Sequence, residues 1–256
     1  MRLSRALAIP AAVAVLLTIV GAWVDGSESA SAPPASASAP SSVPIAPAST
    51  GTVPVPTARP TATSCAQVVH IGDSTSVGLM SEDYIEDPAL RIDAQYARVG
   101  VTDFRNEIAG ARSIVERYHG EENASDVATR EKASGFEGCW VLALGTTDAA
   151  NMAAGGVPDA AARIDRMFAI TGDDPVLWVN VKTLEADPDD WADSHMVAWN
   201  QALVDAQARH PTLRVYDWAA VVQDAWFQDD HIHYTSAGSV ERARMIADAL
   251  VTAYPS

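Results

Sequence analysis

The feature that most constrains the fold is an alternation, from about residue 64 onward, of short apolar runs with amphipathic segments. Five apolar runs have the length of a strand: Val68–Ile71, Leu90–Tyr96, Trp140–Leu144, Val176–Val181 and Leu213–Asp217. Between them, apolar residues recur at helical spacing, as at Phe104, Ile108, Ala111, Val115 and Tyr118, and at Val240, Ala243, Ala247, Leu250 and Val251. This alternation predicts an α/β fold, in which a parallel sheet carries helices on both faces.

The composition divides the chain into three parts. Two arginines precede an uncharged apolar stretch, Ala6–Val24, which is typical of a secretory signal peptide and, at about 19 residues, is also long enough for an N-terminal membrane anchor. Residues 27–63 consist almost wholly of Ser, Ala, Pro, Thr and Val. We therefore expect a signal peptide or anchor at 1–26, a disordered linker at 27–63, and one domain at 64–256 outside the cytoplasm.

Charge and cysteine content narrow the class of protein. The chain has 33 acidic against 17 basic side chains and a formal net charge of −16, which argues against nucleic acid or an anionic membrane surface as a partner. Its two cysteines, Cys65 and Cys139, both lie in the exported part. We expect them to form a disulfide, with two buried thiols as the alternative.

Three polar motifs follow strands of the predicted sheet. "GDS" (72–74) follows the first strand, "GTTD" (145–148) the third, and "DDHIHY" (229–234) the fifth. Ligands of such sheets bind outside the carboxyl ends of the strands, so we expect the three motifs to converge on one edge.

That edge contains the residue types of a catalytic triad. A serine hydroxyl becomes a nucleophile when a base takes its proton and a third group orients the base. Asp230 and His233 are three residues apart, which lets the carboxylate reach one ring nitrogen while the other faces Ser74. We predict Ser74, His233 and Asp230 as the triad. His231 is the rival base, but Gln228 stands three residues before it and offers no charged partner.

Other interpretations of these motifs are weaker. His231 and His233 with Asp229 and Asp230 are metal-ligand types, but no third histidine motif or cysteine is near, so we expect no metal and no cofactor. The Gly-x-Ser-x-Gly motif of α/β-hydrolases is absent, and "GDSTSVG" lacks the Lys-Ser/Thr ending of a phosphate loop.

The motifs together resemble a known family. "VHIGDSTSVG", "ALGTTDAAN" and "DDHIHYTSAG" are similar to the first, third and fifth blocks of SGNH (GDSL-type) serine hydrolases, in that family's order and from Cys65 to the C-terminus. "VLWVNV", "AWNQAL" and "RVYDWA" resemble the soluble SGNH domains of actinobacterial membrane acyltransferases, which act on cell-envelope glycans. The resemblance implies a three-layer α/β/α sandwich with strand order 2-1-3-4-5, with Ser74 as nucleophile and Asp230–His233 as its base pair.

The resemblance also implies an oxyanion hole. Its donors would be the backbone N–H of Ser74, a glycine N–H after the second strand, and the asparagine of Gly-x-Asn-Asp. Gly100, in "RVGVT", best matches the glycine, with Ala97-Arg98 as an alternative alignment. Thr147 stands where the family has its asparagine. A hydroxyl donates one proton where an amide offers two, so we expect weaker stabilisation of the oxyanion.

The implied strand order also bears on the cysteines. It makes the first and third strands parallel neighbours, about 4.8 Å apart. Cys65 and Cys139 would then lie nearly level at the edge opposite Ser74, at a spacing that a disulfide accepts.

Two functions follow as hypotheses. The first is an exported serine esterase or O-acyltransferase that works through an acyl-enzyme on O-acyl esters, in the first place acetyl esters, of cell-envelope carbohydrate. Its partners would be an acylated carbohydrate or small ester and, if the N-terminus tethers the chain to the membrane, a membrane acyl-donor protein. The second is a non-catalytic glycan-binding module on the same fold. Thr147 favours the second, whereas the complete Ser74, Asp230 and His233 set favours the first.

Overall fold

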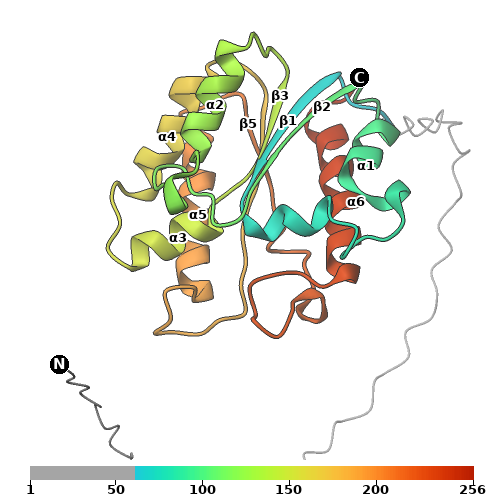
Figure 1. Ribbon diagram of the computed structural model, residues 1–256. Coiled ribbons are helices and arrows are strands. Elements are labelled where there is room, and N and C mark those ends of the chain that lie inside the picture. The colour runs from blue at the N-terminus through green and yellow to red at the C-terminus, as the bar shows by residue number, and fades with distance from the viewer. Residues whose placement is uncertain (1–60) are drawn as a thin grey trace, which may run out of the picture. The chain divides into compact units, whose positions relative to one another are not determined.

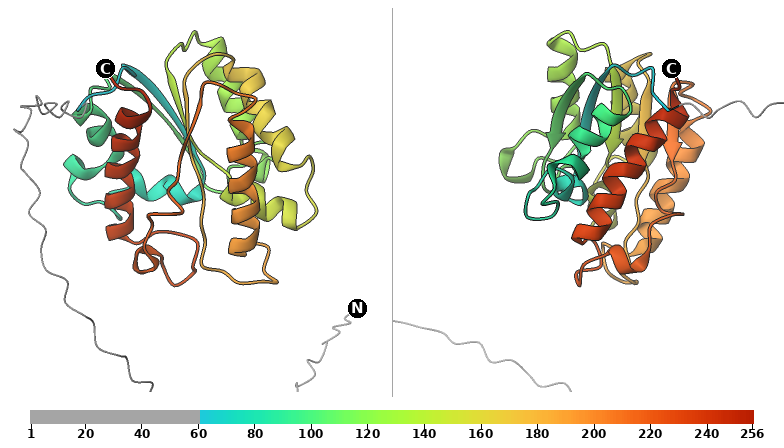
Figure 2. Two further views of the ribbon diagram at one scale, coloured as in Figure 1. Left: turned by 180° about the vertical axis from the view of Figure 1, so that it is seen from behind. Right: turned by 90° about the vertical axis from the view of Figure 1, so that its right-hand side faces the viewer.

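The computed structural model of the protein describes residues 61–256, which form a five-stranded sheet between two layers of helices (Figure 1 and Figure 2). The strands lie in the order β2-β1-β3-β4-β5, and all neighbours are parallel. Their bounds are Gln67–Gly72 (β1), Asp103–Ile108 (β2), Cys139–Ala143 (β3), Val176–Val179 (β4) and Leu213–Tyr216 (β5). The predicted fold class and strand order are therefore confirmed.

The helices separate into two layers, as Figure 1 shows. One face of the sheet is covered by α1 (Ile92–Arg98) and α6 (Ser236–Ala253). The other face carries α2 (Ala124–Ala133), α3 (Thr146–Ala153), α4 (Ala160–Thr171) and α5 (Asp193–Ala206). Short 3₁₀ helices lie in the connections: η1 (Ser74–Leu79), η2 (Pro88–Leu90), η3 (Tyr118–Gly120) and η4 (Asp224–Trp226).

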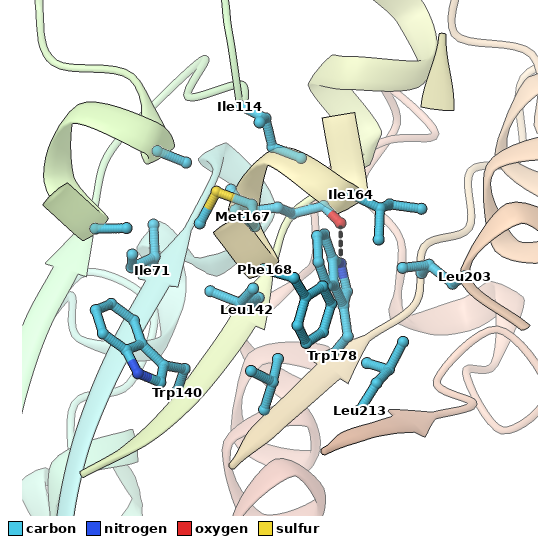
Figure 3. Close-up of a cluster of buried hydrophobic side chains, with 14 of the residues drawn as sticks. Ile71, Ile114, Trp140, Leu142, Ile164, Met167, Phe168, Trp178, Leu203 and Leu213 are labelled. Atoms are coloured by element: carbon cyan, nitrogen blue, oxygen red, sulfur yellow. Dashed lines mark hydrogen bonds between the residues drawn. The ribbon is translucent and has the colours of Figure 1, made fainter. Parts of the chain in front are cut away.

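Each face of the sheet has its own apolar core, because successive side chains of a strand point to opposite faces. In β1, Val68 packs on the α1/α6 side, whereas Val69 and Ile71 pack on the α2–α5 side. Figure 3 shows the second of these cores, in which the buried Trp178 donates its indole N–H to the carbonyl of Leu144 at 2.9 Å. The ring is thus buried without an unpaired polar atom.

The prediction that Leu90–Tyr96 forms the second strand is wrong. This segment forms the end of η2 and most of helix α1. Ile92, Gln95 and Tyr96 are its buried side chains. Their i, i+3, i+4 spacing is that of one helical face. The apolar run also has the length of a strand, and the sequence interpretation overlooked this helical spacing.

The second strand is instead β2, Asp103–Ile108, inside a segment expected to be helical. It pairs with β1 in the register Gln67↔Asp103 to Gly72↔Ile108. Phe104 and Ile108 are four residues apart, and a spacing of four fits both one face of a helix and one face of a strand. The pairing with β1 resolves this ambiguity in favour of a strand.

The described residues also bear on the ends of the domain. Thr63, at the end of the range expected to be linker, is buried and donates its hydroxyl to the Tyr254 carbonyl at 2.8 Å. The expected signal peptide or anchor at 1–26, and all but the last three residues of the linker expected at 27–63, lie outside the described residues. Within 61–256, none of the helices has the length and apolar character needed to cross a membrane.

Cys65 and Cys139 form the predicted disulfide, with a Cα–Cα distance of 5.7 Å across 74 residues of sequence. The two cysteines are not level in the sheet, because Cys139 pairs with Val68 rather than with Cys65. Cys65 lies in a turn before β1, in which the N–H of Ala66 donates to the carbonyl of Ser64. The bridge lies at the amino ends of β1 and β3, a strand length from Ser74.

We predict that Cys65→Ser lowers the melting temperature. Loss of a bridge that closes a loop of this length destabilises the native state by about 4 kcal/mol, or about 10 °C for a domain of this size. Thermal unfolding followed by circular dichroism measures the change, with the double variant Cys65→Ser/Cys139→Ser as the control. Two titratable thiols in the native, non-reduced protein, together with an unchanged melting temperature in both variants, would contradict the assignment.

Candidate active site

Ser74 is the first residue of η1, directly beyond the carboxyl end of β1. Asp73 caps η1, and its Oδ1 accepts the backbone N–H of Thr75 at 3.0 Å and the hydroxyl of Thr75 at 2.7 Å. Gly72 has no room for a side chain, because a Cβ there would lie 2.8 Å from the Cβ of Ser76. The glycine and the aspartate of "GDS" therefore shape the turn that presents a half-buried Ser74.

The structure brings Ser74, His233 and Asp230 together as expected from the spacing. His233 Nε2 lies 2.8 Å from Ser74 Oγ, and His233 Nδ1 lies 2.7 Å from Asp230 Oδ2. The second oxygen of Asp230 accepts the backbone N–H groups of Ile232 and His233 at 3.0 and 2.9 Å. Partial burial works to raise the pKa of Asp230, but these hydrogen bonds outweigh it and hold the pKa below its ordinary value. Asp230 is thus a carboxylate at neutral pH.

His231 lies away from Ser74. Its Nδ1 is 3.2 Å from Glu185 Oε1, and its backbone carbonyl accepts the N–H of Leu184. The positive φ of 58° at His231 reverses the chain between Asp230 and His233. Within residues 61–256, no group of three or more His, Cys, Asp or Glu side chains is arranged to hold a metal ion.

The segment that carries Asp230 and His233 is anchored at both ends. The N–H of Gln228 donates to the carbonyl of His233 at 2.8 Å, and the side-chain amide of Gln228 donates to the carbonyl of Tyr234. Trp218 Nε1 donates to the Tyr234 hydroxyl at 2.8 Å in the core. A loop closed in this way keeps the side chains of Asp230 and His233 in position even though they are partly exposed.

Gly100 does not reach this edge, and its prediction as an oxyanion donor is wrong. It precedes β2, and a Cβ on it would lie next to Ala62 and Thr63, at the amino ends of the strands. The alternative, Ala97-Arg98, lies in α1. The error follows from the misplaced second strand, because the expected glycine comes after that strand.

Gly110 is the glycine that follows the true second strand, and the sequence interpretation missed it. The N–H of its neighbour Ala109 donates to the carbonyl of Gly72 at 3.1 Å, two residues before Ser74. The only signal in the sequence was the spacing of Phe104 and Ile108, which also fits one face of a strand and ends just before Gly110.

Thr147 lies in the first turn of α3 and is 5% exposed. Its hydroxyl has no hydrogen-bond partner among the described residues. The pKa of the buried Asp73 is raised by burial, and the backbone N–H of Thr147 is among the groups that oppose the rise, so the third motif lies close to the first. The side-chain amides of Asn151 and Asn180 donate to the carboxylates of Glu116 and Asp217.

A small cavity adjoins Ser74 and His233. Its volume is about 30 Å³. Besides Ser74 and His233, it is lined by Thr75, Val77, Gly78, Tyr84, Gln228, Tyr234 and Ser239. The space is enough for a group of very few heavy atoms.

Comparison with known proteins gives the class of fold. No family model matches the chain, and no curated protein matches it. Among solved structures, it is similar to the lipase/acylhydrolase from Enterococcus faecalis, at 15% identity over 73% of this chain and 96% of that one, with a TM-score of 0.55. It is similar to a carbohydrate acetylesterase family member from Sinorhizobium meliloti, at 14% identity over 73% and 98%, with a TM-score of 0.55.

A third similar structure is the C-terminal catalytic domain of peptidoglycan O-acetyltransferase A from Streptococcus pneumoniae, with a methylsulfonyl adduct. The identity is 16%, over 74% of this chain and 92% of that one, and the TM-score is 0.53. At these identities the comparisons show the fold. The predicted resemblance is thus confirmed for the fold, which the chain shares with esterases and with an acetyltransferase domain.

Proposed function

We propose that the domain is a serine esterase or O-acyltransferase that forms an acyl-enzyme on Ser74. The observation that carries the proposal is the position of His233, whose two ring nitrogens lie 2.8 Å from Ser74 Oγ and 2.7 Å from Asp230 Oδ2. One base thus has both a hydroxyl to deprotonate and a carboxylate to stabilise the imidazolium that forms.

The proposed reaction has two halves. Ser74 Oγ attacks the ester carbonyl carbon while His233 takes the hydroxyl proton, and His233 then returns that proton to the leaving alkoxide as its C–O bond breaks. The acyl group remains on Ser74 and the alcohol departs. In the second half, His233 deprotonates water or a sugar hydroxyl, which attacks the acyl carbon. The bond between that carbon and Ser74 Oγ then breaks, and His233 returns the proton to Ser74. Water yields the free acid, and a sugar hydroxyl yields a new ester.

Three donors are proposed for the oxyanion: the backbone N–H groups of Ser74 and Gly110, and the hydroxyl of Thr147. The bond from Ala109 to Gly72 supports Gly110, because it holds the end of β2 beside the nucleophile turn. The unpartnered hydroxyl of Thr147 supports the third donor, since no other described group competes for its proton. Donors held in place before the reaction stabilise charge at little reorganisation cost.

The proposed substrate is a short-chain O-acyl ester, in the first place an acetyl ester, of cell-envelope carbohydrate. The cavity of about 30 Å³ beside Ser74 supports a short acyl group. Two of the similar structures are a carbohydrate acetylesterase family member and a peptidoglycan O-acetyltransferase domain, which supports acetylated carbohydrate as the substrate class.

We further propose that the protein is exported, with its N-terminus as a signal peptide or membrane tether, and that a membrane acyl-donor protein is its partner in the transferase form. The disulfide between Cys65 and Cys139 supports export, because such bridges persist in oxidising compartments. The apolar stretch Ala6–Val24 supports a leader or tether.

A glycan-binding module without turnover is the second candidate. The observation that favours it is Thr147, which offers one short hydroxyl where the resemblance implies an amide. The arrangement of Ser74, His233 and Asp230 favours catalysis, because a triad is defined by the geometry and roles of its members.

We predict that Ser74→Ala removes turnover of 4-nitrophenyl acetate, because the acyl-enzyme cannot form. His233→Ala should be nearly as damaging, whereas His231→Ala, the matched control two residues away, should change the rate less than about threefold, since it contacts Glu185 instead. Release of nitrophenol measures the rates, and circular dichroism checks the fold. Equal rates for wild type and Ser74→Ala would refute the catalytic proposal.

Thr147→Asn should raise the esterase rate, because an amide restores a second proton where negative charge develops. Thr147→Val removes the hydroxyl at nearly the same volume and should lower kcat by up to about a hundredfold, or about 3 kcal/mol. Both variants are compared with wild type at saturating ester, with melting temperatures as controls. An unchanged kcat in Thr147→Val would show that this position has no oxyanion role.

The rate should fall as the acyl chain lengthens from acetate to butyrate to octanoate, because the cavity beside Ser74 is small. Tyr84 lines this cavity, and its ring lies against Gly78. Tyr84→Ala should therefore raise the butyrate-to-acetate ratio of kcat/KM. A wild-type preference for octanoate would contradict the assignment of the cavity to the acyl group.

A further inference from the structure

A buried ion cluster lies behind the site, centred on Arg163 of α4. The Arg163 side chain is 0% exposed. Its Nη1 lies 2.8 Å from Asp148 Oδ1 and 2.6 Å from Glu116 Oε2, and its Nε donates to the carbonyl of Pro158 at 2.8 Å. Its Nη2 donates to the other oxygen of Glu116, so the two groups pair in a bidentate arrangement.

Asp148 connects this cluster to the third motif. It is the residue after Thr147, in the first turn of α3, and that helix begins without a side-chain cap. The Asp148 carboxylate instead accepts the backbone N–H of Ile114 at 3.0 Å, in the segment that follows β2. One oxygen of Asp148 therefore bonds to both Arg163 and Ile114.

Glu116 connects the cluster to the same segment. Its carboxylate accepts the Ser113 hydroxyl at 2.6 Å and the Asn151 amide at 3.1 Å. Burial works to raise the pKa of Glu116, but hydrogen bonds from Arg163 and Ser113 outweigh this and hold it at about 2. Burial raises the pKa of Asp148 to about 7, against the opposing bonds from Ile114 and Arg163. The Arg163–Glu116 bridge is thus charged throughout the neutral range.

The segment 109–117 is held by hydrogen bonds on both sides of Gly110. On one side, the N–H of Ala109 donates to Gly72 beside the nucleophile turn. On the other, Ile114 donates to Asp148. Gly110 itself is exposed, with open space where a Cβ would be, so packing does not hold it in place. A buried ion cluster adds little to the stability of a fold, because the cost of desolvating the ions offsets their attraction. The position of this cluster, between the segments that carry Gly110 and Thr147, points instead to a role in positioning them.

We propose that Arg163 is a positioning residue for the site: through Asp148 and Glu116 it sets the distance between Thr147 and Gly110, two oxyanion donors from different segments. This inference rests on the proposed function. It predicts that loss of Arg163 weakens stabilisation of the transition state while ester binding is retained.

The test is a double-mutant cycle between Arg163→Met and Thr147→Val, with 4-nitrophenyl acetate as substrate. Arg163→Met alone should lower kcat by about ten- to a hundredfold with KM within about twofold, since a misplaced donor is costly in the transition state. In the Thr147→Val background the same change should cost at least about threefold less, because one of the donors that Arg163 positions is gone. Independent, multiplicative losses would overturn the inference.

Two further variants separate positioning from folding. Phe168→Ala, a buried change on the same helix outside the ion cluster, should lower the melting temperature but leave kcat within about twofold at 15 °C. Should Arg163→Met fail to fold, Glu116→Gln, at the partly exposed end of the cluster, replaces it in the cycle. Loss of kcat in Phe168→Ala equal to that in Arg163→Met would assign the effect to stability and overturn the proposal.

A readout independent of turnover distinguishes this inference from the proposed function. If wild type and Ser74→Ala hydrolyse the ester equally, the proposed function fails. Amide hydrogen exchange then still tests the positioning: Arg163→Met should speed exchange in residues 109–117 and leave β1 unchanged. Unchanged exchange at 109–117 would overturn it.

Discussion

The parallel pairing of β1 with a neighbour on each side is the constraint on which the rest of the structure depends. Gly72 is opposite Ile108 of β2 and opposite Ala143 of β3, so the three strands end together. The segments that follow them carry Ser74, Gly110 and Thr147. Because parallel strands place all their carboxyl ends at one edge, residues far apart in sequence meet there without a dedicated binding domain.

The segment that carries Asp230 and His233 is placed by a loop rather than by the end of a strand. Ser74 and His233 are 159 residues apart, and the hydrogen bond between them depends on where the loop before α6 leaves the sheet. That loop is held by the Tyr234 ring, which packs in the core against Trp218 and under the Arg242 guanidinium, 5.0 Å from the ring centroid. The partly exposed His233 is thus held in place by the residue that follows it.

The charged residues on the two sides of the site differ in how deeply they are buried. Beside His233, Asp230 is partly exposed and is held ionised by hydrogen bonds of 2.7 to 3.0 Å within four residues of chain. Beside Thr147, Asp148 and Arg163 are fully buried and bridge three separate segments. Burial of ions is costly, and the buried ions lie where the segments after β2 and β3, which carry the proposed donors Gly110 and Thr147, meet.

The sequence by itself determined the class of fold, the turn at Ser74 and the juxtaposition of Asp230 with His233, because each rests on local spacing or on strand ends. It also determined the partner of Cys65, because the chain has only one other cysteine. Tertiary structure decided which segment is the second strand, and with it the replacement of Gly100 by Gly110 at the site edge. Phe104 and Ile108 fit either a helix or a strand, since four residues complete about one helical turn and also two strand periods. Only the hydrogen bonds from β1, which come from 36 residues earlier in the chain, distinguish the two.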